Sequence, residues 1–320
     1  MKILIKKIII FLSLSFLVII ALALISSETI KSRADLKIPK KNTTIVVGHS
    51  HSQCSVNDSI LSNTSNLSSS GESYFYNFQK LKQIINENSQ IKTVLIEFTN
   101  NNVDSIMDEW TWGYEKMSFY LQYYSPYIGS EDFNLLMDNN PTDLFTSYSI
   151  ATRKNLYRIL RSDYSLIDDF GGYTESKLSK VDDLIAKKDF NSSISKNHVV
   201  SNVNLKYLRK MIDECRKNNV DIFLIRSPQH ELYADLGNES IYQKVLKTQF
   251  NDVELLDFDN MKFPNKYYLD LHHLNYKGSL QFSKLLNELI ENNILTTDNK
   301  QEMIDKAILN FNLKQVKPNF

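Results

Sequence analysis

The sequence is poor in the features that mark several large classes of protein. It has only two cysteines, Cys54 and Cys215, too few for a disulfide framework, and we expect both to be buried on helices. Its 37 basic and 37 acidic residues give a net charge of 0, so no overall field attracts nucleic acid. No Walker-type glycine loop, Gly-x-Gly-x-x-Gly sequence or Cys-x-x-Cys pair occurs. With 42% hydrophobic and 23% charged residues, the composition is that of a globular protein.

One long apolar run is present, at residues 8–25, and Lys2, Lys6 and Lys7 precede it. At about 1.5 Å per residue the run is just long enough to cross a bilayer, and the preceding lysines favour a cytoplasmic N-terminus. We therefore expect a membrane anchor, with the main domain outside the cytoplasm, in the periplasm or at the cell surface. A signal peptide cleaved near Ala21-Leu22-Ala23 is the competing interpretation, and it exports the same domain.

The division of the chain follows from this run and from the polar stretch behind it. We expect an anchor over residues 1–26, a polar and basic linker over 27–42, and a folded domain over 43–320. Four short apolar runs inside that domain predict strands: 43–48, 93–98, 221–225 and 253–257. Apolar residues at helical spacing predict helices over 74–88, 204–218, 239–250 and 275–290. Alternation of the two patterns predicts an α/β fold with a parallel sheet.

Residues 103–200 interrupt this alternation after the strand at 93–98. The pattern predicts helices around 103–122, 130–138 and 142–160, and aromatic residues are dense between residues 110 and 127. We interpret the stretch as an α-helical insertion at the active edge of the sheet. Its aromatic rings either line a wall on which sugars stack or pack the insertion's own core, and packing is favoured because buried aromatic rings remove large areas from water.

A candidate nucleophile follows the first strand. The run Thr44-Ile45-Val46-Val47 ends at Gly48, where the absence of a Cβ permits a sharp turn, and Ser50 comes two residues later. Ser50 is thereby expected at the carboxyl end of a strand and at the start of a helix, which we expect to include Val56, Ile60 and Leu61. Open α/β sheets bind ligands at that edge. A serine in this position can act as a nucleophile if a histidine reaches it.

A suitable histidine occurs near the C-terminus. Asp270 and His273 are separated by two residues, just before the helix that Asn275 is expected to cap. This spacing lets the carboxylate orient the imidazole while the other ring nitrogen faces Ser50. A Ser-His-Asp set in this chain order is usable, because triads are defined by geometry and not by sequence position.

These residues resemble the SGNH/GDSL hydrolase superfamily, through Gly48-x-Ser50 after the first strand and Asp270-x-x-His273 before the last helix. The similarity covers about residues 43–292 and is greatest to membrane-anchored bacterial members related to polysaccharide O-acetyltransferases of the cell envelope. It implies a further short strand within 62–70, and hence a flavodoxin-like three-layer sandwich with a five-stranded parallel sheet.

The resemblance also implies an oxyanion hole formed by the N–H groups of Ser50 and Gly71 and by the side chain of Asn101. The sequence departs from the family at two positions. The usual Gly-Asp-Ser reads Gly48-His49-Ser50, and Thr99 stands where the family's asparagine motif begins with glycine.

Other residues at the same edge are expected to contact substrate: His49, His51, Asn100, Pro228 and His230. His230 is an alternative base, but we interpret it as a residue at the rim of the site. Four histidines around one site raise the question of zinc. The serine and aspartate account for the cluster without a metal, so we expect no metal and no cofactor.

The expected function is that of an extracytoplasmic serine esterase or O-acyl(acetyl)transferase acting on ester groups of cell-envelope glycan. If water accepts the acyl group, the enzyme is an esterase, and if a sugar hydroxyl accepts it, the enzyme is a transferase. The expected partners are an acylated glycan or small ester, the membrane and envelope polysaccharide machinery, but not nucleic acid. The alternative is a catalytically inactive binding or assembly subunit for envelope polysaccharide.

Overall fold

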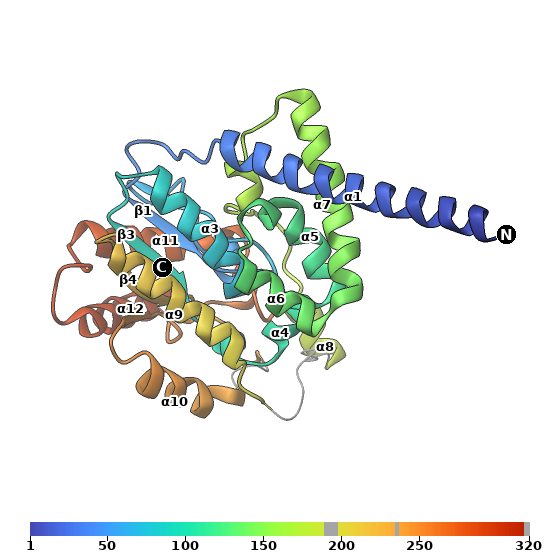
Figure 1. Ribbon diagram of the computed structural model, residues 1–320. Helices are drawn as coiled ribbons and strands as arrows, with labels where there is room; N and C mark the ends of the chain where they lie inside the picture. Colours follow the sequence, from blue (N-terminus) through green and yellow to red (C-terminus); the bar gives the residue numbers. More distant parts are fainter. Residues whose placement is uncertain (189–197, 234–236, 317–320) are drawn as a thin grey trace. The chain divides into compact units, whose positions relative to one another are not determined.

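The computed structural model describes residues 1–188, 198–233 and 237–316, and the chain folds as two compact units (Figure 1). One unit, the helical unit, consists of residues 1–36 and 111–169. The other, the sheet unit, consists of residues 37–110 and 170–320. The helical unit thus has narrower bounds than the predicted insertion over 103–200, of which residues 189–197 lie outside the described part.

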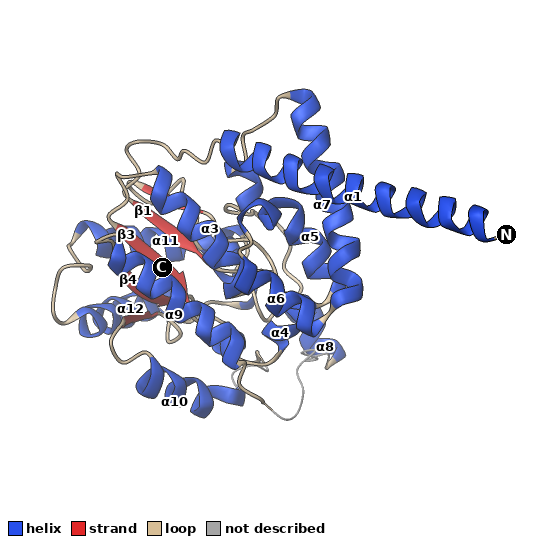
Figure 2. Cartoon of the chain, in the orientation of Figure 1, coloured by secondary structure: helices blue, strands red, loops and turns tan. Residues whose placement is uncertain are grey.

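The sheet unit is built on a five-stranded, all-parallel sheet with the order β2-β1-β3-β4-β5. Its strands are β1 (Thr44–Val47), β2 (Thr64–Asn66), β3 (Thr93–Glu97), β4 (Asp221–Arg226) and β5 (Glu254–Asp257). Helices flank the sheet on both sides, as Figure 2 shows. The predicted α/β fold and flavodoxin-like strand order are confirmed, including the short strand between residues 62 and 70.

The helices of this unit follow the amphipathic patterns of the sequence. They are α2 (Ser50–Ser55), α3 (Tyr74–Glu87), α8 (Val181–Lys187), α9 (Asn202–Lys217), α10 (Glu239–Gln249), α11 (Tyr276–Glu291) and α12 (Lys300–Val316), with 3-10 turns η1 (Asn100–Val103) and η5 (Asn265–Tyr267). Asn275 caps α11 as predicted, because its side chain accepts from the N–H groups of Lys277 and Gly278.

The helix that begins at Ser50 is shorter than the sequence suggests. It ends at Ser55, and Val56 has extended dihedral angles, so the expectation that Val56, Ile60 and Leu61 lie on this helix is wrong. The side-chain amide of Asn66 on β2 donates to the carbonyl oxygens of Ser52 and Val56 and ties this end of the helix to the sheet. Val56 and Leu61 are buried all the same, because the following loop packs into the core.

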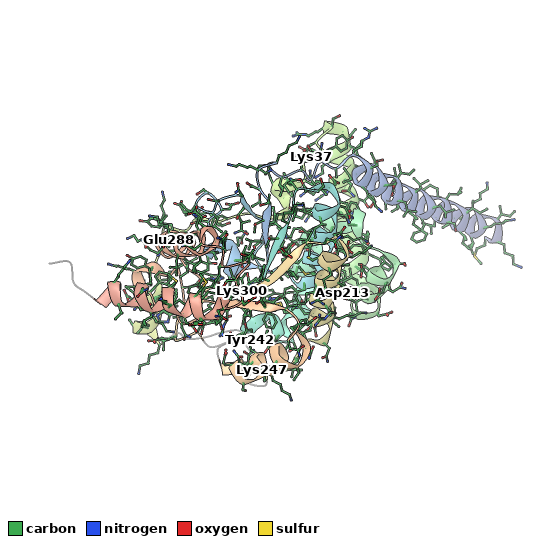
Figure 3. All side chains as sticks on the ribbon, turned by 90° about the vertical axis from the view of Figure 1, so that its left-hand side faces the viewer. Lys37, Asp213, Tyr242, Lys247, Glu288 and Lys300 are labelled. Atoms are coloured by element: carbon green, nitrogen blue, oxygen red, sulfur yellow. The ribbon has the colours of Figure 1, made fainter. Side chains whose placement is uncertain are left out.

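The core lies on both faces of the sheet, which is why β1 and β3 are apolar without alternation. On one face, Val46 and Leu95 pack with residues of α11 and α12, among them Phe282 and Ile304. Ile304 on α12 is fully buried. Lys300 at its start (Figure 3) pairs with Glu254 on β5.

The helical unit contains the helices α1 (Lys2–Arg33), α5 (Tyr114–Tyr124), α6 (Ser130–Asn139) and α7 (Pro141–Arg161). It also contains the 3-10 turns η2 (Ser125–Tyr127) and η3 (Ile167–Phe170), except for Phe170, which belongs to the sheet unit. The chain passes between the units within α4 (Ile106–Trp112). Helix α7 packs against α1, α5 and α6. Tyr120 and Tyr124 on α5 are buried, which favours the packing role for these two aromatic rings.

Helix α1 is long and apolar enough to cross a membrane. It continues to Arg33, so residues 27–33 are helical and the predicted linker begins later than expected. The reason is tertiary, since Ser26 and Ile30 are buried where α1 packs against α7 and η2. The side chains of the N-terminal part stand free around the helix (Figure 3).

Candidate active site

The turn that presents Ser50 is built around a buried carboxylate. Gly48 passes so close to Glu97, the last residue of β3, that a Cβ on Gly48 would clash with the Cβ of Glu97. Oε2 of Glu97 accepts hydrogen bonds from the backbone N–H groups of His49, at 3.1 Å, and Ser52, at 2.6 Å. Glu97 thus holds the turn and the first residues of α2. The sequence interpretation missed it, although an acidic residue at the end of an otherwise uncharged buried strand was the available signal.

Ser50, His273 and Asp270 form a continuous chain of hydrogen bonds. Oγ of Ser50 lies 2.8 Å from Nε2 of His273, and Nδ1 of His273 lies 2.9 Å from Oδ1 and 3.1 Å from Oδ2 of Asp270. The contacts expected from the sequence are therefore present. His230 and His51 do not take the place of His273 beside Ser50.

The electrostatics of Asp270 suit it to orient an imidazole. Burial alone would raise the pKa of its carboxyl group, but the hydrogen bond and charge of His273 and the N–H of His272 hold the pKa below its ordinary value. Oδ1 also accepts from the backbone N–H of His273 at 2.9 Å. The side chain is thus an ionised acceptor, and Nδ1 of His273 carries a proton toward it. That leaves Nε2 free to accept the proton of Ser50.

The loop that carries these two residues is closed by backbone contacts. Tyr268 and Leu274 form an isolated antiparallel bridge, and the N–H of Leu269 donates to the carbonyl of His273 at 2.9 Å. The side-chain amide of Asn275 donates to the carbonyl oxygen of Tyr268 at 3.2 Å. Asn275, which caps α11, therefore also fixes the loop that carries Asp270 and His273.

A second imidazole flanks Ser50. Nδ1 of His49 lies 3.3 Å from Oγ of Ser50, while Nε2 lies 2.6 Å from Oε1 of Glu97 and 3.0 Å from Oδ1 of Asn101. Because Nε2 faces two oxygen acceptors, it carries a proton. His49 is completely buried and stands edge-on to the ring of Trp110. The contact of His49 with substrate stays a prediction.

The side chain of Asn101 is oriented by its oxygen. Oδ1 lies 2.7 Å from the hydroxyl of Thr99 and 3.0 Å from Nε2 of His49, both of which can donate to it. Among the described residues, no hydrogen bond engages its Nδ2, which is left as a donor. Thr99 and His49 together hold this amide in place.

Gly71 follows β2 in a left-handed conformation, with φ of 76°, which suits glycine. The loop containing it is tied to the turn at Ser50, because the N–H of Ser69 donates to the carbonyl of Gly48 at 3.1 Å. The role of Gly71 as an oxyanion donor stays a prediction.

Four further residues that were expected to contact substrate lie inside the fold. Asn100, Pro228 and His230 are buried, as is His51. Oδ1 of Asn100 accepts from the guanidinium of Arg226 at 2.7 Å. Both ring nitrogens of His230 are engaged, Nε2 with Asn265 and Nδ1 with the N–H of Leu232. Polar groups at a buried sheet edge must satisfy one another. The roles of Asn100, Pro228 and His230 as substrate contacts stay predictions.

His51 and His272 complete the histidine cluster. Nδ1 of His51 lies 3.2 Å from Nε2 of Gln229, and burial, followed by the positive charge of neighbouring histidines, holds its pKa well below 6.5. Burial likewise lowers the pKa of His272, which lies beside His273 with ring centroids 5.6 Å apart. In the described part of the chain, no three His, Cys, Asp or Glu side chains are arranged to hold a metal ion.

The buried carboxylate leads to a prediction about stability. Burial alone would raise the pKa of Glu97, but His49 and the N–H of Ser52 lower it below 4.5. Its ionisation therefore stabilises the fold above about pH 4.5, and this contribution is lost as the pH falls through the lower, folded-state pKa. Glu97→Gln is expected to cost about 3 kcal/mol at neutral pH, and the difference from wild type should shrink in acid.

Urea unfolding between pH 7 and pH 3 measures this difference. Glu288→Gln is the matched control, because Glu288 is exposed on α11 (Figure 3). Equal unfolding free energies for wild type and Glu97→Gln at pH 7 would contradict the role assigned to this carboxylate.

Comparison with known proteins adds little to the geometry. A model of an uncharacterised protein family matches residues 173–295, less than half of the chain. The matched stretch includes Asp270 and His273 but not Ser50. No curated protein matches the chain.

Proposed function

We propose that this chain is a serine esterase or O-acyltransferase of the SGNH/GDSL type. One observation carries the proposal, which is the chain of hydrogen bonds from Ser50 through His273 to Asp270 at the carboxyl edge of a parallel sheet. A serine aligned with a histidine, which is itself aligned with an ionised carboxylate, is the arrangement that activates a hydroxyl as a nucleophile.

In the proposed reaction, Nε2 of His273 removes the proton from Ser50 as Oγ attacks the carbonyl carbon of an ester. Asp270 stabilises the imidazolium that forms. The tetrahedral intermediate then expels the alkoxide, which takes the proton from His273 and leaves as an alcohol, and the acyl group remains on Ser50. Water or a sugar hydroxyl, deprotonated by His273, attacks this acyl group and restores the serine.

The oxyanion of the intermediate is assigned to Nδ2 of Asn101 and to the N–H of Ser50, with the N–H of Gly71 as a further donor. The support for Asn101 is the fixed orientation of its amide, since Thr99 and His49 both hold Oδ1. A donor that is already oriented costs no reorganisation when the negative charge develops.

The proposed substrate is an acylated glycan or a small ester outside the cytoplasm. Helix α1 can serve as the anchor, and Lys2, Lys6 and Lys7 before its apolar run favour a cytoplasmic N-terminus. A reporter fused after Lys41 should therefore be active outside the cytoplasm. Activity of that fusion only in the cytoplasm would refute the envelope location and remove the argument for a glycan.

A binding or assembly subunit for envelope polysaccharide is the second candidate. It is favoured by His49, which replaces the family's aspartate, and by the 8% exposure of Ser50. A fluorophosphonate probe separates the two functions, because it forms a covalent bond only with an activated serine. Labelling that maps to Ser50 supports the enzyme, and polysaccharide binding by an unlabelled, folded chain supports the binding subunit.

A further inference from the structure

Helix α7 exposes a stripe of apolar and basic side chains. Leu160 is 85% exposed, more than any other large apolar residue of the described chain except Met1, and Phe145 and Tyr157 are also more than half exposed. Arg153 and Arg161 are exposed on the same helix. At about 100° per residue, these five positions spread over about 160° of the helix circumference, on the side opposite the buried residues of α7. The guanidinium of Arg161 lies 4.3 Å from the centre of the Tyr157 ring.

The opposite face of α7 is covered within the helical unit. Its buried residues are Leu144, Ser147, Ala151, Asn155 and Arg158, and the helix packs against α5 and α1. Figure 1 shows α7 beyond α5, on the side of this unit toward which the N-terminal half of α1 extends. The exposed stripe, which faces away from α5, therefore points in the direction in which α1 enters the membrane.

The distance along α1 determines how near α7 comes to that membrane. The apolar run ends at Ile25, and the buried positions of α1 are Ser26 and Ile30. At about 1.5 Å per residue, Ile30 lies only about 8 Å beyond the end of the run. The headgroup layer on each side of a bilayer is about 5–8 Å thick, and a helix with its side chains is about 10 Å wide. A helix packed at these positions must overlap the headgroup layer.

We propose that the exposed stripe of α7 is a membrane-surface contact, seated in the headgroup layer of the bilayer that α1 spans. Phe145, Tyr157 and Leu160 enter the boundary between headgroups and acyl chains, while Arg153 and Arg161 meet lipid phosphates. Aromatic and basic side chains on one helical face are typical of elements that lie in this interface. The proposal requires α1 to be inserted, but it does not depend on the chemistry at Ser50.

The test measures the surroundings of residue 160 in the full-length protein. A bimane fluorophore is attached to Leu160→Cys, in a Cys54→Ser/Cys215→Ala background, and the protein is reconstituted as single copies in nanodiscs of phosphatidylcholine and phosphatidylglycerol. The matched control is Leu309→Cys, since Leu309 is an exposed leucine on α12 in the sheet unit. Phosphatidylcholine with a nitroxide on its headgroup quenches from the membrane surface, and iodide quenches from water.

We expect the nitroxide lipid to quench the label at residue 160 several-fold more than the label at residue 309, and iodide to quench it less. Adding Arg153→Glu and Arg161→Glu should weaken the lipid quenching at residue 160. Quenching of that label by iodide but not by the nitroxide lipid would overturn the proposal. Protection from both quenchers would also overturn it, because it would indicate that protein covers the stripe, and dimers in detergent would identify a second copy.

Discussion

Replacing Ser50 by alanine is expected to reduce ester turnover by roughly 10⁴- to 10⁶-fold, because no other group can form the acyl intermediate. The fold should persist, since the substitution removes only one oxygen atom from a site that is 8% exposed. Release of acetate from an acetylated glycan, or of nitrophenol from a nitrophenyl ester, measures the loss, and thermal melting measures the fold. Ser59→Ala is the matched control, because Ser59 is exposed just beyond α2 and should retain full activity.

His273→Ala should cause a similar loss, and the double variant with Ser50→Ala should lose no more than either single variant. The two residues act as one unit, so that removal of one already removes the contribution of the other. Asp270→Asn should be comparable or milder, because the base remains but its orientation and charge stabilisation are disturbed. Unchanged turnover in all three variants, with unchanged melting, would show that Ser50 is not the nucleophile.

Asn101→Ala is expected to lower kcat by about 10²–10³-fold with little change in KM, because the lost hydrogen bond forms mainly in the transition state. Labelling of Ser50 by the fluorophosphonate should slow in parallel, since its oxygen occupies the same site. A variant that raised KM alone would assign Asn101 to substrate binding instead.

The orientation of this amide is tested by a double-mutant cycle. Thr99→Val removes a hydroxyl at nearly constant shape, and His49→Gln removes the imidazole whose Nε2 faces Oδ1. Each should lower kcat by less than Asn101→Ala does. In combination with Asn101→Ala neither should add a further loss, because both act through that side chain. If the loss from His49→Gln multiplied with that from Asn101→Ala, His49 would instead act directly on Ser50, from which its Nδ1 lies 3.3 Å away.

Much of the fold could be predicted because hydrophobic patterns within short segments of the sequence indicate its strands and helices. Runs such as Ile45-Val46-Val47 are apolar at every position, as a strand buried on both faces must be. The amphipathic spacing of α3, α9 and α11 likewise follows from a single buried face. The ends of α1 and α2 could not be predicted in this way. Packing against α7 extends the first helix, and contacts with Asn66 accompany the early end of the second.

The residues of the candidate site likewise fall into two groups, those that the sequence predicted and those that only the structure identified. The sequence by itself determined a serine after a buried strand and an aspartate and histidine at triad spacing, because chain connectivity alone places such residues at the carboxyl edge of a parallel sheet. Only the tertiary structure decided that Glu97 and His49 pair beneath Ser50, and that Asn100 and His230 turn inward. The physical reason is that a buried polar group must find a partner, and its partner here comes from a segment distant in the sequence. Local patterns do not encode which distant polar groups meet.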